Sequence, residues 1–373
     1  MTYVSTPHES PAAAATETSS RLVSLDALRG FDMLWITGGG LLGGALRAFG
    51  PESNVAPIAQ QLQHVSWEGF HFEDLIFPMF VFIAGVSLVF SLPKMVAREG
   101  RGGAMRRIIS RTIILFALGI FVSGGLSRGI DDVRWLGVLQ RIAFSYCGAA
   151  LLSLWLKPRG LIIAALTLLL GYWALLTFVP VPEFGAGDFT EGHNLTNYLD
   201  KMYLGGRKYD GDHDPEGMLS TLPAIASCLL GVLAGHWLRS ETTPNRKTVG
   251  LVVAGAVLLG LGWAWSPWFP VIKKLWTSSF VLVAAGWSAL LFALFYWIIE
   301  IRRWLAWTPP WVWIGMNPIT LYIVAGIVSF TTVAKRVTGP ANASPEWLPA
   351  AVGFLLILLL ARFLYRRKIF LRV

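Results

Sequence analysis

The chain alternates between long apolar blocks and short polar connections. Blocks 75–90, 161–180 and 249–265, for example, contain no charged residue. A helix of about 20 residues spans a hydrocarbon core of about 30 Å, and lipid offers no partner for backbone N–H and C=O groups, so each block must be helical. The pattern predicts an all-α, polytopic integral membrane bundle of about ten transmembrane helices, at residues 27–49, 73–93, 108–126, 135–156, 160–181, 217–239, 247–266, 277–299, 311–331 and 346–365.

The composition supports this prediction and excludes an ordinary soluble protein. Of the 373 residues 54% are hydrophobic and 14% are charged, and the mean hydropathy is +0.57. A soluble domain carries about 25% charged residues. Several of the 17 Trp, such as Trp135 and Trp268, lie at block edges, where indole rings suit the membrane interface. Cys147 and Cys228 both lie inside apolar blocks and form no disulfide framework or metal-binding spacing.

The basic residues indicate how the bundle is oriented. With a cytoplasmic N-terminus, 20 Lys and Arg fall on the inner side and 10 on the outer side, with six of the inner ones in 94–111. The positive-inside rule therefore places both termini in the cytoplasm and leaves loops 50–72 and 182–216 facing outward. Because the basic residues are spread over short loops rather than gathered in one groove, the net charge of +9 does not indicate a nucleic-acid partner.

The domain organisation is simple. Residues 1–20 are rich in Ala, Ser and Thr and lack the basic and apolar regions of a signal peptide, so they are interpreted as a disordered N-terminal tail. Residues 21–373 are interpreted as a single transmembrane domain. No internal repeat of the kind found in many secondary transporters is visible.

The segment from His64 to Gly85 is the densest in unusual residues. His64 lies on an outward loop that enters an apolar block, and Glu73 and Asp74 fall in the first turn of that helix. A histidine suits proton transfer near neutral pH, and a nearby carboxylate can orient its ring. The alternative is that these residues are only interfacial, with Glu73 and Asp74 complementing the helix dipole.

Asp26 and Arg29 lie at the inner end of the first block. Three residues apart, they share one helix face and can pair. The pair is either a simple surface ion pair or part of an anion site for a phosphate-bearing donor in the cytoplasm.

Polar residues also occur inside the apolar blocks. Arg141, which follows Gln140, costs about 2.5–3.5 kcal/mol at the centre of a span, so it is expected to face a polar cavity. Asn317, followed by Pro318, either lines a cavity or marks a kink.

The segment 210–217 is rich in carboxylates. Asp214 as N-cap, Pro215 at the first helical position and Glu216 in the first turn predict a helix start, and Glu216 is free for a further role. No metal is expected, because the nearby candidate ligands lack a regular spacing; they are His193, Asp212, His213 and Asp214.

Six motifs occur in one order along the chain: Ser24-x-Asp-x-x-Arg-Gly30, His64-x-Ser-Trp-x-Gly-(four residues)-Asp-Leu-x-Phe-Pro78, Gly137-Val-Leu-Gln-Arg141, Asp214-Pro-Glu-Gly217, Lys274-Leu-Trp276 and Gly315-Met-Asn317. Together they resemble the heparan-α-glucosaminide N-acetyltransferase family and its bacterial relatives. The lysosomal members of the family have an Asn near the glycine run of the equivalent block, where this chain has Ile36 and Thr37.

The resemblance implies an acetyl-CoA-dependent transmembrane acyltransferase. The acetyl group would pass from cytoplasmic acetyl-CoA to the amine of a glucosamine-type sugar on the far side, and no metal cofactor is implied. The implied catalytic residues are His64 and Asp74. The implied substrate-binding residues are Trp67, Glu68, Glu216 and Asn317, and the implied cofactor-binding residues are Asp26, Arg29, Gln140, Arg141, Lys274 and Trp276. The expected location is a bacterial inner (plasma) membrane, with the lipid bilayer, acetyl-CoA and the sugar as partners and a homodimer left open.

Several alternatives stay open from the residues alone. His64 either acts as a general base or carries the acetyl group covalently. Buried polar residues suit a transporter of sugars or cell-wall precursors equally well. A membrane O-acyltransferase and a non-catalytic membrane scaffold are further readings.

Overall fold

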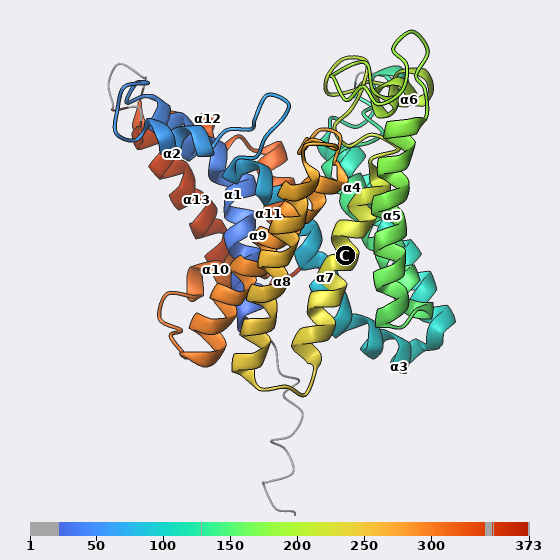
Figure 1. The fold of residues 1–373 in the computed structure, drawn as a ribbon. Coiled ribbons are helices and arrows are strands. Elements are labelled where there is room, and N and C mark those ends of the chain that lie inside the picture. The colour runs from blue at the N-terminus through green and yellow to red at the C-terminus, as the bar shows by residue number, and fades with distance from the viewer. Residues whose placement is uncertain (1–21, 128, 340–344, 346, 372–373) are drawn as a thin grey trace, which may run out of the picture.

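The computed structural model describes residues 22–127, 129–339, 345 and 347–371, so the predicted tail 1–20 lies outside the described residues. The described chain consists of helices and loops, with isolated β-bridges and no strand. Figure 1 shows the helices as a bundle with loops gathered at its two ends. The main helices are α1 Val23–Arg47, α2 Ala56–Gln61, α3 Phe72–Val122, α4 Val138–Trp155, α5 Pro158–Phe178, α6 Leu195–Tyr203, α7 Thr221–Arg239, α8 Pro244–Trp265, α9 Ser278–Tyr296, α10 Pro309–Gly315, α11 Pro318–Ile327, α12 Phe330–Thr338 and α13 Trp347–Arg366.

The predicted multi-pass helical architecture is confirmed. Seven helices in the described part of the chain are long and apolar enough to cross a membrane, and the bent pair α10–α11 would make an eighth. The 51-residue α3 contains two of the predicted spans, and α1 is helical but is not among the seven. The count of about ten spans and the cytoplasmic location of both termini stay predictions.

A break in α3 separates its two halves. Gly100 has φ 70° and ψ 177°, a conformation that glycine adopts without the clash of a side chain. The chain turns there, and in Figure 1 the middle of α3 crosses the lower end of the bundle before its second half rises again. This stretch includes the basic segment 94–107.

The loops sort to the two ends as the sequence predicted. In Figure 1, α2 and α6 lie at the upper end, and the α7–α8 connection lies at the lower end. At the upper end Trp67 Nε1 donates to the carbonyl of Phe189 over 3.0 Å, which joins loops 50–72 and 182–216. At the lower end the backbone N–H of Ser24 donates to Glu300 Oε1 over 3.1 Å. Which end faces the cytoplasm stays a prediction.

Glycines allow the central helices to approach closely. Gly85 of α3 faces the carbonyl of Cys228 on α7, and Gly231 of α7 faces the carbonyl of Phe82 on α3. A Cβ at either glycine would collide with backbone atoms. Inside a bilayer the hydrophobic effect does little to hold helices together, because lipid tails are as apolar as the side chains. Membrane helices therefore associate largely through close packing, which small residues at their contacts allow.

The predicted span 311–331 is not one continuous helix. Residues of α10 and α11 form two short helices bent by 76°, and α12 follows as a separate helix. Pro318 has no N–H for an interior helical hydrogen bond, and Asn317 before it has φ −133° and ψ 43°, outside the helical region. Of the two readings of Asn317, the structure supports the kink.

The predicted helix start at Asp214 is also wrong, because α7 begins at Thr221. The Asp214 carboxylate instead accepts hydrogen bonds from Arg134 and from the backbone N–H groups of Tyr209 and Glu216. Gly217 N donates to the Asp214 carbonyl over 2.8 Å, which makes the segment a turn rather than a helix.

Candidate active site

A pocket of about 340 Å³, which we call the outer pocket, lies at the end of the bundle that carries loops 50–72 and 182–216. Its walls come from α1, the starts of α3 and α4, α11 and the loops of that end. The lining residues are Ile36, His64, Val65, Trp67, Glu73, Ile76, Phe77, Arg134, Val138, Tyr209, Pro215, Glu216, Lys273, Lys274, Trp276 and Tyr322.

His64 and Asp74 form a hydrogen-bonded pair at the mouth of this pocket. His64 Nδ1 lies 2.9 Å from Asp74 Oδ1, and Asp74 is completely buried at the start of α3. Asp74 Oδ2 accepts from the backbone N–H groups of Val65 (3.3 Å) and His71 (3.0 Å), so the carboxylate is fixed from three directions. Because a carboxylate only accepts, the His64–Asp74 hydrogen bond forms in the tautomer that carries the proton on Nδ1, and in that tautomer Lys273 can donate only to the lone pair of Nε2. The His64 side chain is 57% exposed.

Lys273 lies against the same pair. Its Nζ is 2.9 Å from His64 Nδ1, 3.3 Å from His64 Nε2 and 3.4 Å from Asp74 Oδ1. Burial lowers the pKa of Lys273, although the charge of Asp74 opposes this effect. An ammonium in this position is well placed to stabilise negative charge that develops beside His64.

The loops that carry these residues are joined through their backbones. Glu68 and Ile272 form an antiparallel bridge, and Gly69 N donates to the carbonyl of Val271 over 2.9 Å. The Glu68 side chain is exposed and does not line the outer pocket. Its main chain positions Lys273 near His64, and its substrate-binding role stays a prediction.

Arg134 holds two carboxylates in place on a second side of the outer pocket. It donates to both Asp214 oxygens, over 2.8 and 2.7 Å, and to Glu216 Oε2 over 2.6 Å. Burial disfavours its charge, but the hydrogen bonds that Arg134 donates to the Asp214 carboxylate hold the pKa of Arg134 above its usual value. Glu216 lines the pocket, and its carboxylate is held in place by this arginine, while its substrate-binding role stays a prediction.

Arg141 does not line the outer pocket. It is 1% exposed and donates to the carbonyl of Ser220 (2.9 Å) and to its hydroxyl (2.6 Å), with further bonds to the carbonyls of Pro215 and Gly217. Its guanidinium also lies 5.0 Å from the ring centre of Trp276. Arg141 therefore fixes the 215–220 segment and the Trp276 wall of the pocket, and its predicted contact with the cofactor stays untested.

Three other predicted residues are placed as follows. Trp67 lines the outer pocket. Gln140 is 1% exposed between α3 and α4, with Nε2 3.4 Å from the carbonyl of Phe116. Asn317 is 1% exposed, and neither polar side-chain atom has a hydrogen-bond partner among the described residues.

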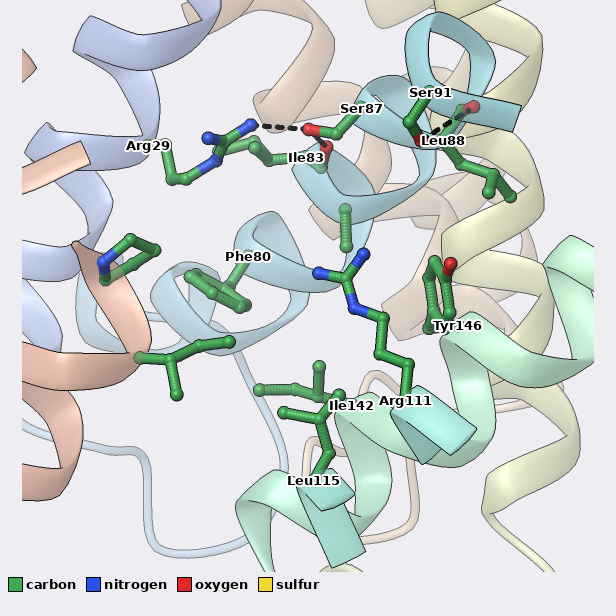
Figure 2. A pocket seen from close by; sticks show the side chains of 13 residues that line it. Arg29, Phe80, Ile83, Ser87, Leu88, Ser91, Arg111, Leu115, Ile142 and Tyr146 are labelled. Atoms are coloured by element: carbon green, nitrogen blue, oxygen red, sulfur yellow. Dashed lines mark hydrogen bonds between the residues drawn. The ribbon is translucent and has the colours of Figure 1, made fainter. Parts of the chain in front are cut away.

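A second pocket of about 240 Å³, which we call the inner pocket, lies nearer the opposite end. Figure 2 shows Arg29 of α1 and Arg111 of α3 pointing into the same space from two sides. Arg29 donates to Ser87 Oγ over 2.6 Å and pairs with Asp26 over 3.3 Å, as the spacing predicted. The Arg111 guanidinium lies 4.6 Å from the ring centre of Tyr146.

A narrow apolar neck of about 20 Å³ separates the two pockets. It shares Phe80, Leu115 and Ile142 with the inner pocket, and it shares Ile36 and Val138 with the outer pocket. The three spaces therefore follow one another along the bundle. Arg29 and Ile36 are seven residues apart on α1, which corresponds to about 10 Å along the helix.

The comparison with known proteins identifies the family. A family model described as the catalytic part of heparan-alpha-glucosaminide N-acetyltransferase matches residues 21–262, more than half of the chain. The chain belongs to this family. The match covers α1 to α8 and so includes His64, Asp74, Arg134 and Glu216, whereas Lys273 lies beyond it.

Two curated relatives are similar over most of the chain. Human heparan-alpha-glucosaminide N-acetyltransferase is 27% identical over 83% of this chain and 56% of its own length. The mouse protein of the same name is 26% identical over the same shares. The chain thus spans about half the length of these relatives. The resemblance inferred from the motifs is confirmed.

Some site residues were missed from the sequence. Lys273, Arg134, Tyr209 and Arg111 were treated only as loop charges or not at all. Lys273 is 209 residues from His64, and no local pattern indicates such a contact. A signal was present for Lys273, since it precedes Lys274-Leu-Trp276, one of the family motifs.

Proposed function

We propose that this protein is a transmembrane N-acetyltransferase that transfers acetyl from acetyl-CoA on the inner side to the amine of a glucosamine-type sugar on the outer side. The observation that carries the proposal is the continuous lining from the basic inner pocket, through the apolar neck, to the outer pocket with its His64–Asp74 pair. Family membership supports the same activity.

The two pockets suit the two ends of acetyl-CoA. Arg29 and Arg111 offer guanidinium groups to the phosphates, which are too strongly charged to cross hydrocarbon. The pantetheine arm is slender and uncharged, so it suits the apolar neck. The neck has room for one or two water molecules, so the arm must rotate the side chains of Phe80 and Ile142 aside, and a sugar ring does not pass.

The outer pocket suits an amino sugar. Glu73 and Glu216 place carboxylates in its wall, where they can hold the ammonium form of the acceptor. Trp67 and Tyr209 offer aromatic surfaces against which the apolar face of a sugar ring can pack. An acceptor sugar bound in this way can bring its amine to His64.

The chemistry follows from the His64–Asp74 pair. His64 Nε2 takes a proton from the acceptor ammonium, and the freed amine attacks the thioester carbonyl carbon. The new C–N bond forms, the C–S bond breaks, and the amine's second proton passes to the leaving thiolate, so one proton per turnover is released overall. Asp74 stabilises the imidazolium that forms, and Lys273 stabilises the negative charge on the carbonyl oxygen.

A direct assay in detergent tests the proposal. Wild-type protein given acetyl-CoA and glucosamine should release free CoA thiol and form N-acetylglucosamine, measured with a thiol reagent and by mass spectrometry. His64→Ala should lower turnover by about 10²–10⁴-fold, because it removes the proton acceptor. The matched control is His193→Ala, whose ring stacks on Phe184 away from the pocket-lining residues and which should turn over normally.

Two results would contradict the proposal: no acetyl transfer by wild type, or wild-type turnover by His64→Ala. The same preparation distinguishes general-base catalysis from a covalent route in which His64 carries the acetyl group. Mass spectrometry after incubation with acetyl-CoA alone would find an acetyl group on His64 if that residue carries it.

A further inference from the structure

Three side chains of the outer segment between α5 and α7 converge beside the outer pocket. They are Glu191, Asp210 and His213, and their ligand atoms lie within 4.8 Å of one another. His213 Nε2 is 3.5 Å from Glu191 Oε1 and 3.8 Å from Asp210 Oδ2. Imidazole and carboxylate together are a donor set that suits zinc and related divalent ions.

His213 points its free nitrogen into this cluster. The side chain is 6% exposed, and Nε2 is buried without a hydrogen-bond partner among the described residues. Nδ1 lies 2.7 Å from Asp212 Oδ1, which fixes the proton on Nδ1 and leaves the lone pair on Nε2. A carboxylate behind the ring is the usual companion of a metal-binding histidine, because it orients the ring and raises its basicity.

The spacing of the donors fits a four-coordinate site. With bonds of about 2.0–2.1 Å, tetrahedral ligand atoms lie about 3.4 Å apart. The two distances from His213 Nε2, 3.5 and 3.8 Å, differ from this by a few tenths of an ångström, and all ligand atoms of the three residues lie within 4.8 Å of one another. Three protein ligands leave one position for water.

A cation is already attracted to the same oxygen atoms. Lys274 Nζ lies 2.7 Å from Glu191 Oε1 and 3.1 Å from Asp210 Oδ2. Lys274 also lies 5.8 Å from the ring centre of Trp67 and lines the outer pocket. An ion bound to these oxygens would therefore compete with the ammonium and release it toward the pocket.

We propose that Glu191, Asp210 and His213 bind a divalent cation of the zinc class, in competition with Lys274. The ion joins two parts of the outer segment that are about 20 residues apart in sequence, and so it stabilises the wall of the outer pocket. The site shares His213 with the four residues considered from the sequence, but its other two ligands are Glu191 and Asp210, and His193 pairs with Asp188 instead. The proposal is independent of acetyl transfer, and its test measures no activity.

The test is metal binding by the full chain in detergent after treatment with a chelator. Titration with zinc chloride, followed by calorimetry and elemental analysis, should give one ion per chain, and zinc should raise the midpoint of thermal unfolding. His213→Gln should weaken binding by at least about tenfold and remove the thermal shift, and Asp212→Asn should weaken it by about 10–100-fold. His193→Gln is the matched control and should bind like wild type.

The Lys274→Met variant tests whether the cluster is a metal site or only a network of ion pairs. Without the competing ammonium, zinc should bind more tightly than to wild type. The proposal would be overturned by no stoichiometric zinc in wild type, by unchanged binding in His213→Gln, or by equal or weaker binding in Lys274→Met.

Discussion

Asp74 combines a structural role at a helix start with the chemical role that we propose for it. Its carboxylate accepts two backbone N–H groups near the beginning of α3 and still bonds the ring of His64. The loop bearing His64 is thereby fixed to a rigid helix. A histidine held in this way loses little entropy when a substrate arrives, which favours proton transfer.

Asp200 is a second buried carboxylate, away from the reacting groups. It lies on α6, is completely buried, and accepts from the backbone N–H groups of Met218 (2.9 Å) and Asp214 (3.4 Å). Burial raises the pKa of Asp200 to about 6. The residue thus ties α6 to the turn that carries Glu216.

This pKa predicts a pH-dependent stability. Between about pH 4 and pH 6 the folded state binds the Asp200 proton more tightly than the unfolded chain does, so the contribution of Asp200 to the free energy of unfolding falls as pH rises through this window. Asp200→Asn cannot titrate. Its midpoint of thermal unfolding relative to wild type should therefore be higher at about pH 7.5 than at about pH 5. An equal difference at both pH values would contradict the assignment.

At the scale of single residues, the sequence predicts which side chains have suitable chemistry better than it predicts which side chains are in contact. His64, Asp74 and the Asp26–Arg29 pair could be predicted because the partners lie within ten residues of each other or on one helix turn. Arg134 could not be paired with Asp214, since 80 residues separate them. Such pairs depend on which loops meet at the end of the bundle.

At the scale of elements, α3 and α7 are in close contact through glycines. Gly85→Ala should destabilise the protein by about 1–3 kcal/mol, because its Cβ would collide with the carbonyl of Cys228. Gly260→Ala on the open face of α8 meets no atom and should instead be neutral or stabilise by up to about 1 kcal/mol. Thermal unfolding in detergent compares the two variants. Equal effects would argue against the α3–α7 contact.

The neck between the pockets gives a second prediction for the elements. Val138 at the start of α4 lines both the neck and the outer pocket, so Val138→Phe should narrow the passage and lower acetyl transfer by at least about tenfold. Adenosine 3′,5′-bisphosphate, which lacks the pantetheine arm, should bind the inner pocket with unchanged affinity.

The control for this variant is Val257→Phe on α8, where the side chain is 53% exposed. It should leave both transfer and nucleotide binding unchanged. If Val138→Phe transferred acetyl at the wild-type rate, the neck would not be the path of the arm.

The elements also show where sequence patterns succeed and fail. Long apolar blocks predict helices because length and hydropathy are local properties. The bend at Pro318 was foreseen only as one of two readings, and the turn at Asp214 was mistaken for a helix start. Pro318 lies at a bend between two helices, and Asp214 is bonded to the distant Arg134. The local preference of these two residues for helix ends therefore did not predict their structure.

At the scale of the whole molecule, the distribution of basic residues and the positions of the two pockets indicate the same orientation in the membrane. The basic segment 94–107 and the inner pocket lie toward one end, and the His64–Asp74 pair with the long outer loops lies at the other. The positive-inside rule predicts that the first of these ends faces the cytoplasm. Donor and acceptor would then meet from opposite sides of the membrane, with only the acetyl group crossing.

Transfer across a sealed bilayer tests this account most directly. Protein is reconstituted in liposomes that contain glucosamine, acetyl-CoA is added outside, and enclosed N-acetylglucosamine is measured by mass spectrometry, with His64→Ala as control and a trapped dye to exclude leakage. The account predicts enclosed product from wild type and none from His64→Ala. Product that forms only when donor and acceptor share one side would contradict it.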